Sequence, residues 1–144
     1  MTAKEYLRQY EHAVNRARRL KREYETELEQ IDAIGSTLSG DGTPHGSGVT
    51  KKTESKAIRL ADKAMAWKMA ELDAMEVRQE VFEMIHDIPG VEGDLLYERY
   101  INLKHWDVIA DELSYTERGL RYAHQRALAI VERRITVPCI SANQ

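Results

Sequence analysis

The chain has 144 residues, enough for one domain or for one small domain with an extended helical part, and too few for an α/β barrel or a doubly wound sheet. Charged residues make up 31% of it and aromatic residues 7%, a balance typical of long helices, so we expect an all-α fold. The formal net charge is −3, so nucleic acid is an expected ligand only where basic residues gather locally.

The first predicted helix covers residues 1–34. Thr2 is a suitable N-cap, and apolar or semi-apolar residues then recur in alternating steps of three and four, as in a coiled-coil seam. The seam consists of Leu7, Tyr10, Val14, Ala17, Tyr24, Leu28 and Ile31, with Lys21 in the one missing place. A basic stretch at 16–22 precedes an acidic one at 23–32, and we interpret both as surface that faces solvent or a partner.

Residues 35–51 are predicted to form a flexible linker. Five of the eight glycines lie there, together with Pro44 and many hydroxyl residues. The segment lacks the GxxxxGK[ST] spacing of a phosphate-binding loop and follows a helix rather than a strand, so we expect no nucleotide site.

A second long helix is predicted over residues 52–88, ended by Pro89 and Gly90. Its large apolar residues fall near one side, which we expect to face the first helix or a second subunit. These residues are Ile58, Ala61, Met65, Met69, Leu72, Met75, Phe82 and Ile85, with Trp67 adding bulk. The methionines indicate an adaptable core rather than a ligand site.

A compact module is predicted over residues 92–134. Asp94 is a candidate cap for its first helix, whose apolar residues are Leu95, Leu96, Tyr97, Tyr100 and Ile101. We expect this helix to pack with Trp106 against the two helices that follow.

Residues 106–131, WDVIADELSYTERGLRYAHQRALAIV, have the pattern of two short helices joined by a tight turn. Thr116 is a good N-cap for the second helix. The apolar positions are Ile109, Ala110 and Leu113 in the first helix, and Leu120, Ala123, Ala127, Leu128 and Val131 in the second. Ser114 stands in the turn where glycine is common, and Gly119 lies inside the second helix, where we favour room for close approach to DNA over a tolerated defect.

The polar face of the second helix suits a DNA major groove. Arginine pairs with guanine, glutamine pairs with adenine, and tyrosine or arginine holds phosphates. The candidate DNA-binding residues are Thr116, Glu117, Arg118, Arg121, Tyr122, Gln125 and Arg126. Five arginines lie between Thr116 and Arg134 against two glutamates, so basic charge is concentrated here. An ordinary amphipathic hairpin with a solvated charged face is the alternative.

The run LLYERYINLKHWDVIADELSYTERGLRYAHQRAL, residues 95–128, resembles the sigma-region-4-like C-terminal module of small phage and prophage transcriptional regulators. That group includes ArpU-like and RinA-like late-gene activators, and the opening TAKEYLRQY with its long helical half is similar too. Family members usually place a small hydroxyl residue before the tryptophan and glycine in the turn, where this chain has His105 and Ser114. The resemblance implies transcriptional regulation in a phage or prophage setting.

No catalytic chemistry is predicted. The five histidines show no HExxH or paired spacing, and the carboxylates are dispersed, so we expect neither enzyme activity nor a cofactor nor a metal. His124 is interpreted as packing on or beside the second helix of the pair. The single cysteine, Cys139 in the tail 135–144, excludes an internal disulfide, and without an apolar leader or span we expect a cytoplasmic protein in a bacterial host.

The sequence therefore predicts a regulator that binds double-stranded DNA and forms a homo-oligomer through its long helices, without membrane contact. One alternative is a phage small terminase subunit, which also joins a DNA-binding helical module to an oligomerising region. Another is an adaptor that binds RNA polymerase or a host protein through the arginine-rich face.

Overall fold

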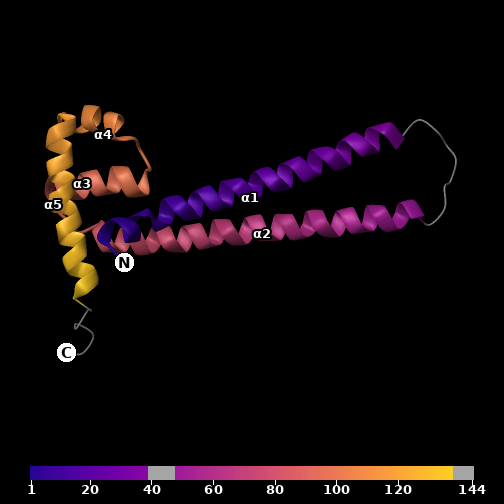
Figure 1. Ribbon diagram of the computed structural model, residues 1–144, viewed down its shortest axis with the longest axis horizontal. Helices are drawn as coiled ribbons and strands as arrows, with labels where there is room; N and C mark the ends of the chain where they lie inside the picture. The colour runs from indigo at the N-terminus through magenta and orange to yellow at the C-terminus, as the bar shows by residue number, and fades with distance from the viewer. Residues whose placement is uncertain (39–47, 138–144) are drawn as a thin grey trace. The chain divides into compact units, whose positions relative to one another are not determined.

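The computed structural model describes residues 1–38 and 48–137, and all of its regular elements are helices (Figure 1). They are α1 (Ala3–Leu38), α2 (Gly48–Ile85), α3 (Gly90–Leu96), the π-helical turn η1 (Tyr97–Ile101), α4 (Trp106–Leu113) and α5 (Glu117–Thr136). The all-α prediction is confirmed: a long α1/α2 hairpin precedes shorter C-terminal helices. None of the helices among these residues is long and apolar enough to cross a bilayer.

The ends of the long helices differ from the prediction. Helix α1 runs past residue 34 to Leu38, and α2 begins at Gly48 and ends at Ile85 instead of spanning 52–88. The predicted linker 35–51 is therefore too long, since both its ends are helical, while residues 39–47 lie outside the described residues. An established helix extends through weak helix formers because each added residue contributes a hydrogen bond without a new nucleation cost. The predicted tail also begins too early, since Ile135 and Thr136 belong to α5; Cys139 lies outside the described residues.

Thr2 caps α1 as predicted. Its backbone N–H donates to Oε2 of Glu5 at 2.7 Å, and the N–H of Glu5 donates to Oγ1 of Thr2 at 3.3 Å. This reciprocal pair is a capping box, which satisfies backbone donors that the first turn leaves free.

Contacts divide the chain into two compact units, which we describe separately: Ala13–Asp73, and Met1–His12 with the described residues from Ala74 onward. In the first unit the predicted seam of α1 faces α2. Tyr24 stacks on Trp67 with ring centroids 5.5 Å apart. The Glu27 carboxylate forms ion pairs with the Lys63 ammonium at 3.3 Å and the Arg59 guanidinium at 3.6 Å. Lys21, in the gap of the seam, places its ammonium 5.6 Å from the centroid of Trp67.

The large apolar residues of α2 between Ile58 and Met75 do not face α1, the first of their two expected partners; pairing with a second subunit stays a prediction. Trp67 lies on the inner side with Ala70, which is buried, whereas the predicted stripe through Met65 and Met69 is exposed. Helix α2 has apolar residues on two opposite sides, so its periodicity alone does not select the packed side. The small Ala70 allows close approach, and the Trp67 ring finds a stacking partner in Tyr24. Further along α2, Phe82 and Ile85 do pack in the core of the other unit, as predicted.

That other unit is held by an apolar cluster to which α1, α2, α3, η1 and α5 all contribute. Its buried members are Ala3, Leu7, Val81, Ile85, Ile88, Leu96, Tyr100, Ile101, Ala127 and Val131. The backbone N–H of Ala3 also donates to Oε2 of Glu132 in α5 at 2.7 Å. The first turns of α1 therefore pack as part of the C-terminal module. The predicted boundaries of that module, residues 92–134, leave them out.

Asp94 does not cap α3, contrary to prediction, because the helix starts four residues earlier. Gly90 has φ +77°, a conformation that reverses the chain after Pro89 at little steric cost. Three residues on, Gly93 lies against the preceding loop so tightly that a Cβ atom would be 1.8 Å from the carbonyl oxygen of Ile88. Only glycine fits where α3 lies against the preceding loop.

Candidate nucleic-acid interface

Helices α4 and α5 pack on α3 through a second apolar cluster. Its buried members are Leu95, Ile109, Ala110, Leu120 and Ala123, with Val91, Trp106 and Leu113 packed against them. Ala110 and Ala123 are small enough for the two helices to cross closely, and both are nearly or fully buried. The predicted apolar stripes of α4 and α5 are confirmed, including Ala127 and Val131 in the first cluster.

The turn between α4 and α5 is closed by Ser114 in the left-handed conformation, with φ 57° and ψ 41°. Its N–H donates to the carbonyl of Asp111 at 3.3 Å, and the N–H of Tyr115 donates to the carbonyl of Ala110 at 3.0 Å. These bonds satisfy the last carbonyls of α4 in the way that a glycine usually allows. Serine thus holds the tight helix-turn-helix geometry in a strained backbone conformation.

Thr116 is the N-cap of α5, as predicted: its Oγ1 accepts a hydrogen bond from the N–H of Gly119 at 3.1 Å. A Cβ at Gly119 would lie 3.1 Å from that same Oγ1 and 3.5 Å from Cδ1 of Tyr115. The structure thus gives Gly119 a role that neither sequence interpretation considered. Its missing side chain leaves room for the cap.

All seven predicted DNA-binding residues lie in the first half of α5 or at its cap, and all are exposed. Among the described residues, the side chains of Arg118, Arg121 and Gln125 form no hydrogen bond or ion pair, and the Arg118 guanidinium lies 5.9 Å from the centroid of the Tyr122 ring. These four residues form one open face, which we call the reading face.

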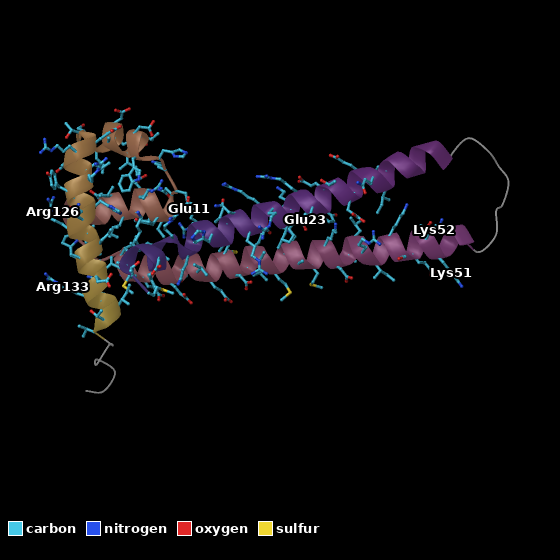
Figure 2. All side chains as sticks on the ribbon, viewed as in Figure 1. Glu11, Glu23, Lys51, Lys52, Arg126 and Arg133 are labelled. Atoms are coloured by element: carbon cyan, nitrogen blue, oxygen red, sulfur yellow. The ribbon has the colours of Figure 1, made fainter. Side chains whose placement is uncertain are left out.

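Arg126 differs from the residues of the reading face because its side chain is paired within the protein. Its Nε donates to Oε1 of Glu92 in α3 at 2.9 Å, and this hydrogen bond is the main reason that the pKa of Glu92 is lowered. Figure 2 shows Arg126 and Arg133 extending from α5, about two turns apart. Near the end of that helix, Arg134 donates to Asp87 at 2.5 Å and to the carbonyl of Met84 at 2.7 Å. Arg126 therefore links α5 to α3, and Arg134 links α5 to the end of α2 and the loop that follows it.

The exposed side of α4 is acidic. Asp107, Asp111 and Glu112 are all exposed, and within the part of the chain that the structure describes only Glu112 of the three is paired, with Lys104 at 2.8 Å. Lys104 also binds Glu98 at 2.6 Å, which together with a bond from Arg99 to the Lys104 carbonyl holds the connection between η1 and α4. The basic surface of the two-helix unit thus belongs to α5 alone.

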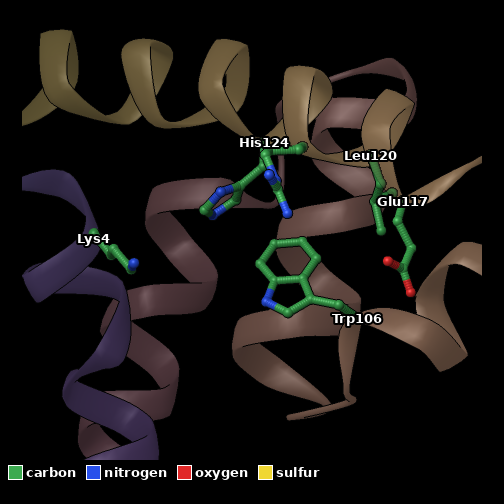
Figure 3. Close-up of a pocket in the computed structure, with 6 residues that line it drawn as sticks. Lys4, Trp106, Glu117, Leu120 and His124 are labelled. Carbon is green, nitrogen blue, oxygen red and sulfur yellow. The ribbon is translucent and has the colours of Figure 1, made fainter.

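A pocket of about 430 Å³ opens beside the start of α5 (Figure 3). It is lined by Lys4, Trp106, Glu117, Leu120, Arg121 and His124. Two of the lining residues, Trp106 and His124, lie edge to face with their ring centroids 4.7 Å apart. Lys4 was not predicted at the site, because nothing in its local sequence connects it with a helix more than a hundred residues away.

His124 is half-buried, in keeping with its interpretation as a packing residue. Its Nε2 lies 2.8 Å from the hydroxyl of Tyr100, and burial, with Lys4 and Arg99 nearby, lowers its pKa to about 4. Burial also raises the pKa of Tyr100 to about 12. Both groups are therefore neutral near pH 7, so this contact is structural and carries no charge toward a ligand.

Comparison of the chain with protein-family models, with curated proteins and with solved structures finds no match.

Proposed function

We propose that this protein is a sequence-specific DNA-binding regulator that inserts α5 into the major groove. The observation that carries the proposal is the reading face of Arg118, Arg121, Tyr122 and Gln125. This face lies on the second helix of a tightly turned pair, and among the described residues its side chains form no hydrogen bond or ion pair. A recognition helix needs side chains of this kind near its N-terminal end, where they reach base edges.

The charge distribution supports α5, and not α4, as the surface that meets DNA. Phosphates attract the unpaired arginines of α5 and repel Asp107 and Asp111 of α4. Arg126 is expected to contribute less than Arg121, because it must give up its bond to Glu92 before it can contact DNA. We therefore assign base contact to the reading face and a supporting role to Arg126, while Thr116 and Glu117 position the first turn.

By its resemblance to sigma-region-4-like phage regulators, we further propose that the protein controls transcription of phage or prophage genes. The setting would then be the cytoplasm of a bacterial host, with RNA polymerase as a second partner of the same module. The exposed arginines of α5 also suit a small terminase subunit, which likewise joins a DNA-binding helical module to an oligomerising region.

The test is selection of bound fragments from a random duplex library with purified protein at near-physiological salt. We expect one enriched site for the wild type. Each bidentate arginine contact to guanine is worth about 1–3 kcal/mol, so the Arg118→Ala, Arg121→Ala double variant should bind that site at least about 30-fold more weakly. Its helical content should be unchanged, because both side chains are exposed.

The matched control is Arg16→Ala, Arg19→Ala, which removes two exposed arginines from α1. It should retain the enriched site. Loss of binding in this control as well would mean that only total charge matters. If no site is enriched and the double variant behaves like the wild type, the DNA proposal fails, and retention of either protein by RNA polymerase would then identify an adaptor. Ring-shaped assemblies would favour the terminase function.

A further inference from the structure

The outer side of α2 carries a row of large apolar residues with no partner among the described residues. Its members are Ile58, Met65, Met69, Leu72 and Met75, each 58–67% exposed, and Ala61 fills the place between the first two. We call this row the α2 stripe. Contiguous exposed apolar surface of this kind marks an interaction site in soluble proteins. The opposite side of α2 is already occupied by α1, so the stripe is free for another partner.

We propose that the α2 stripe is a dimerisation surface that pairs antiparallel with the same stripe of a second copy. The charge along α2 supports this occupant and this direction. From Gly48 to Lys68 the helix has six basic and two acidic residues, and from Met69 to Ile85 it has one basic and five acidic residues. Antiparallel copies place each basic half beside an acidic half, whereas parallel copies place like charges together.

The spacing of the stripe is self-complementary in that direction. A two-fold axis that crosses α2 near Ala66 and Trp67 brings Met65 of one copy beside Met69 of the other. To within one residue, the same register sets the small Ala61 near the larger Leu72, and Ile58 near Met75, so a small side chain meets a large one and the apolar rows coincide. It also brings Lys51, labelled near the start of α2 in Figure 2, to Glu83 of the other copy.

This inference does not rest on DNA binding, because the stripe and the reading face are on different helices. Its first test is the mass of the full chain by sedimentation over a range of concentrations. The wild type should sediment as a dimer of 16.6 kDa chains. Met65→Lys with Met69→Lys should convert it to a monomer, since four ammonium groups would meet at the two-fold axis. Both positions are exposed, so the variant should keep its helical content.

The matched control adds the same charge elsewhere: Asn15→Lys with Gln30→Lys, both exposed on α1, should remain dimeric. A wild type that is monomeric at every concentration overturns the proposal. So does a Met65→Lys, Met69→Lys variant that stays dimeric, because the interface would then lie elsewhere.

Orientation is tested by cross-linking in a Cys139→Ser background. In the antiparallel pair, a chain with Ile58→Cys should form a disulfide with a chain that carries Met75→Cys, and neither should cross-link to itself. The two copies of residue 58 would be separated by 17 helical positions, or about 25 Å. Self-cross-linking of Ile58→Cys would show parallel pairing and overturn the proposed direction.

Discussion

The hydroxyl oxygen of Tyr100 lies 2.8 Å from Nε2 of His124, and the two rings stack with their centroids 5.9 Å apart. This pair joins η1 to α5, and the Trp106 ring lies edge to face with the same imidazole, with centroids 4.7 Å apart. The module therefore depends on a neutral histidine at the inner side of its candidate recognition helix.

Acid should weaken the fold through His124. Its pKa falls from an ordinary 6.5 to about 4 on folding, so between these values the unfolded chain binds more protons than the folded one. The stabilising contribution is complete above pH 6.5 and is lost as the pH falls toward 4, with a slope of at most about 1.4 kcal/mol per pH unit. His124 is only half-buried, so solvent screening makes the actual slope smaller than this limit. Urea unfolding at several pH values measures how the free energy of unfolding depends on pH.

His124→Gln is the control for this prediction, since glutamine does not titrate and its amide can still bond to Tyr100. Its free energy of unfolding should depend less on pH between 4 and 6.5 than that of the wild type. Parallel curves for the two proteins would contradict the assignment to His124.

Ser114→Gly should stabilise the protein. Serine at φ 57° carries a steric cost that glycine avoids, while glycine loses more backbone entropy on folding, so we expect a net gain of up to about 1 kcal/mol. Ser114→Val should do the reverse, because a β-branched residue is least tolerant of positive φ. Thermal unfolding of the three proteins gives the order; a glycine variant less stable than wild type would show that the serine side chain has another role.

Gly93→Ala should destabilise the protein by about 3 kcal/mol or more, beyond the usual range for overpacking. The added methyl group would meet the carbonyl oxygen of Ile88 at 1.8 Å, so α3 would have to move away from the loop that joins it to α2. Gly119→Ala is the matched control. Its methyl group would lie 3.1 Å from Oγ1 of Thr116 and in ordinary contact with Tyr115, so the helix gain of about 1 kcal/mol should offset most of the crowding. Equal effects in urea unfolding would contradict this account.

Thr116→Ala should cost about 1 kcal/mol of stability, the usual value of an N-cap. Oγ1 accepts the N–H of Gly119, and without it the first turn of α5 frays where Arg118 is held. Thr116→Ser should restore stability because serine offers the same acceptor. If serine fails to restore stability, the methyl group of Thr116 and not its hydroxyl is what matters.

DNA affinity should fall steeply with salt if the proposed function is correct. A dimer that neutralises about 6–10 phosphates loses about 10³- to 10⁵-fold in affinity between about 50 and 200 mM salt. Fluorescence anisotropy with a labelled duplex measures the slope. Arg121→Ala should lower the affinity for the enriched site more than Arg126→Ala, whose side chain is paired with Glu92. A flat salt response would contradict DNA binding.

The sequence by itself determined the elements of this fold. Helical periodicity and caps depend on residues three to five positions apart, so the all-α class, the seam of α1 and the caps Thr2 and Thr116 were predicted correctly. The turn at Ser114 was also located, because two periodic stripes are interrupted there.

Only the tertiary structure decided how those elements are used. Helix α2 is apolar on two sides, and the partner Tyr24 selects the side of Trp67, which leaves Met65 exposed. The bond from Ala3 to Glu132 spans 129 positions. No local pattern contains such distant pairs, because they depend on where the chain brings separate helices together and not on the spacing within any one of them.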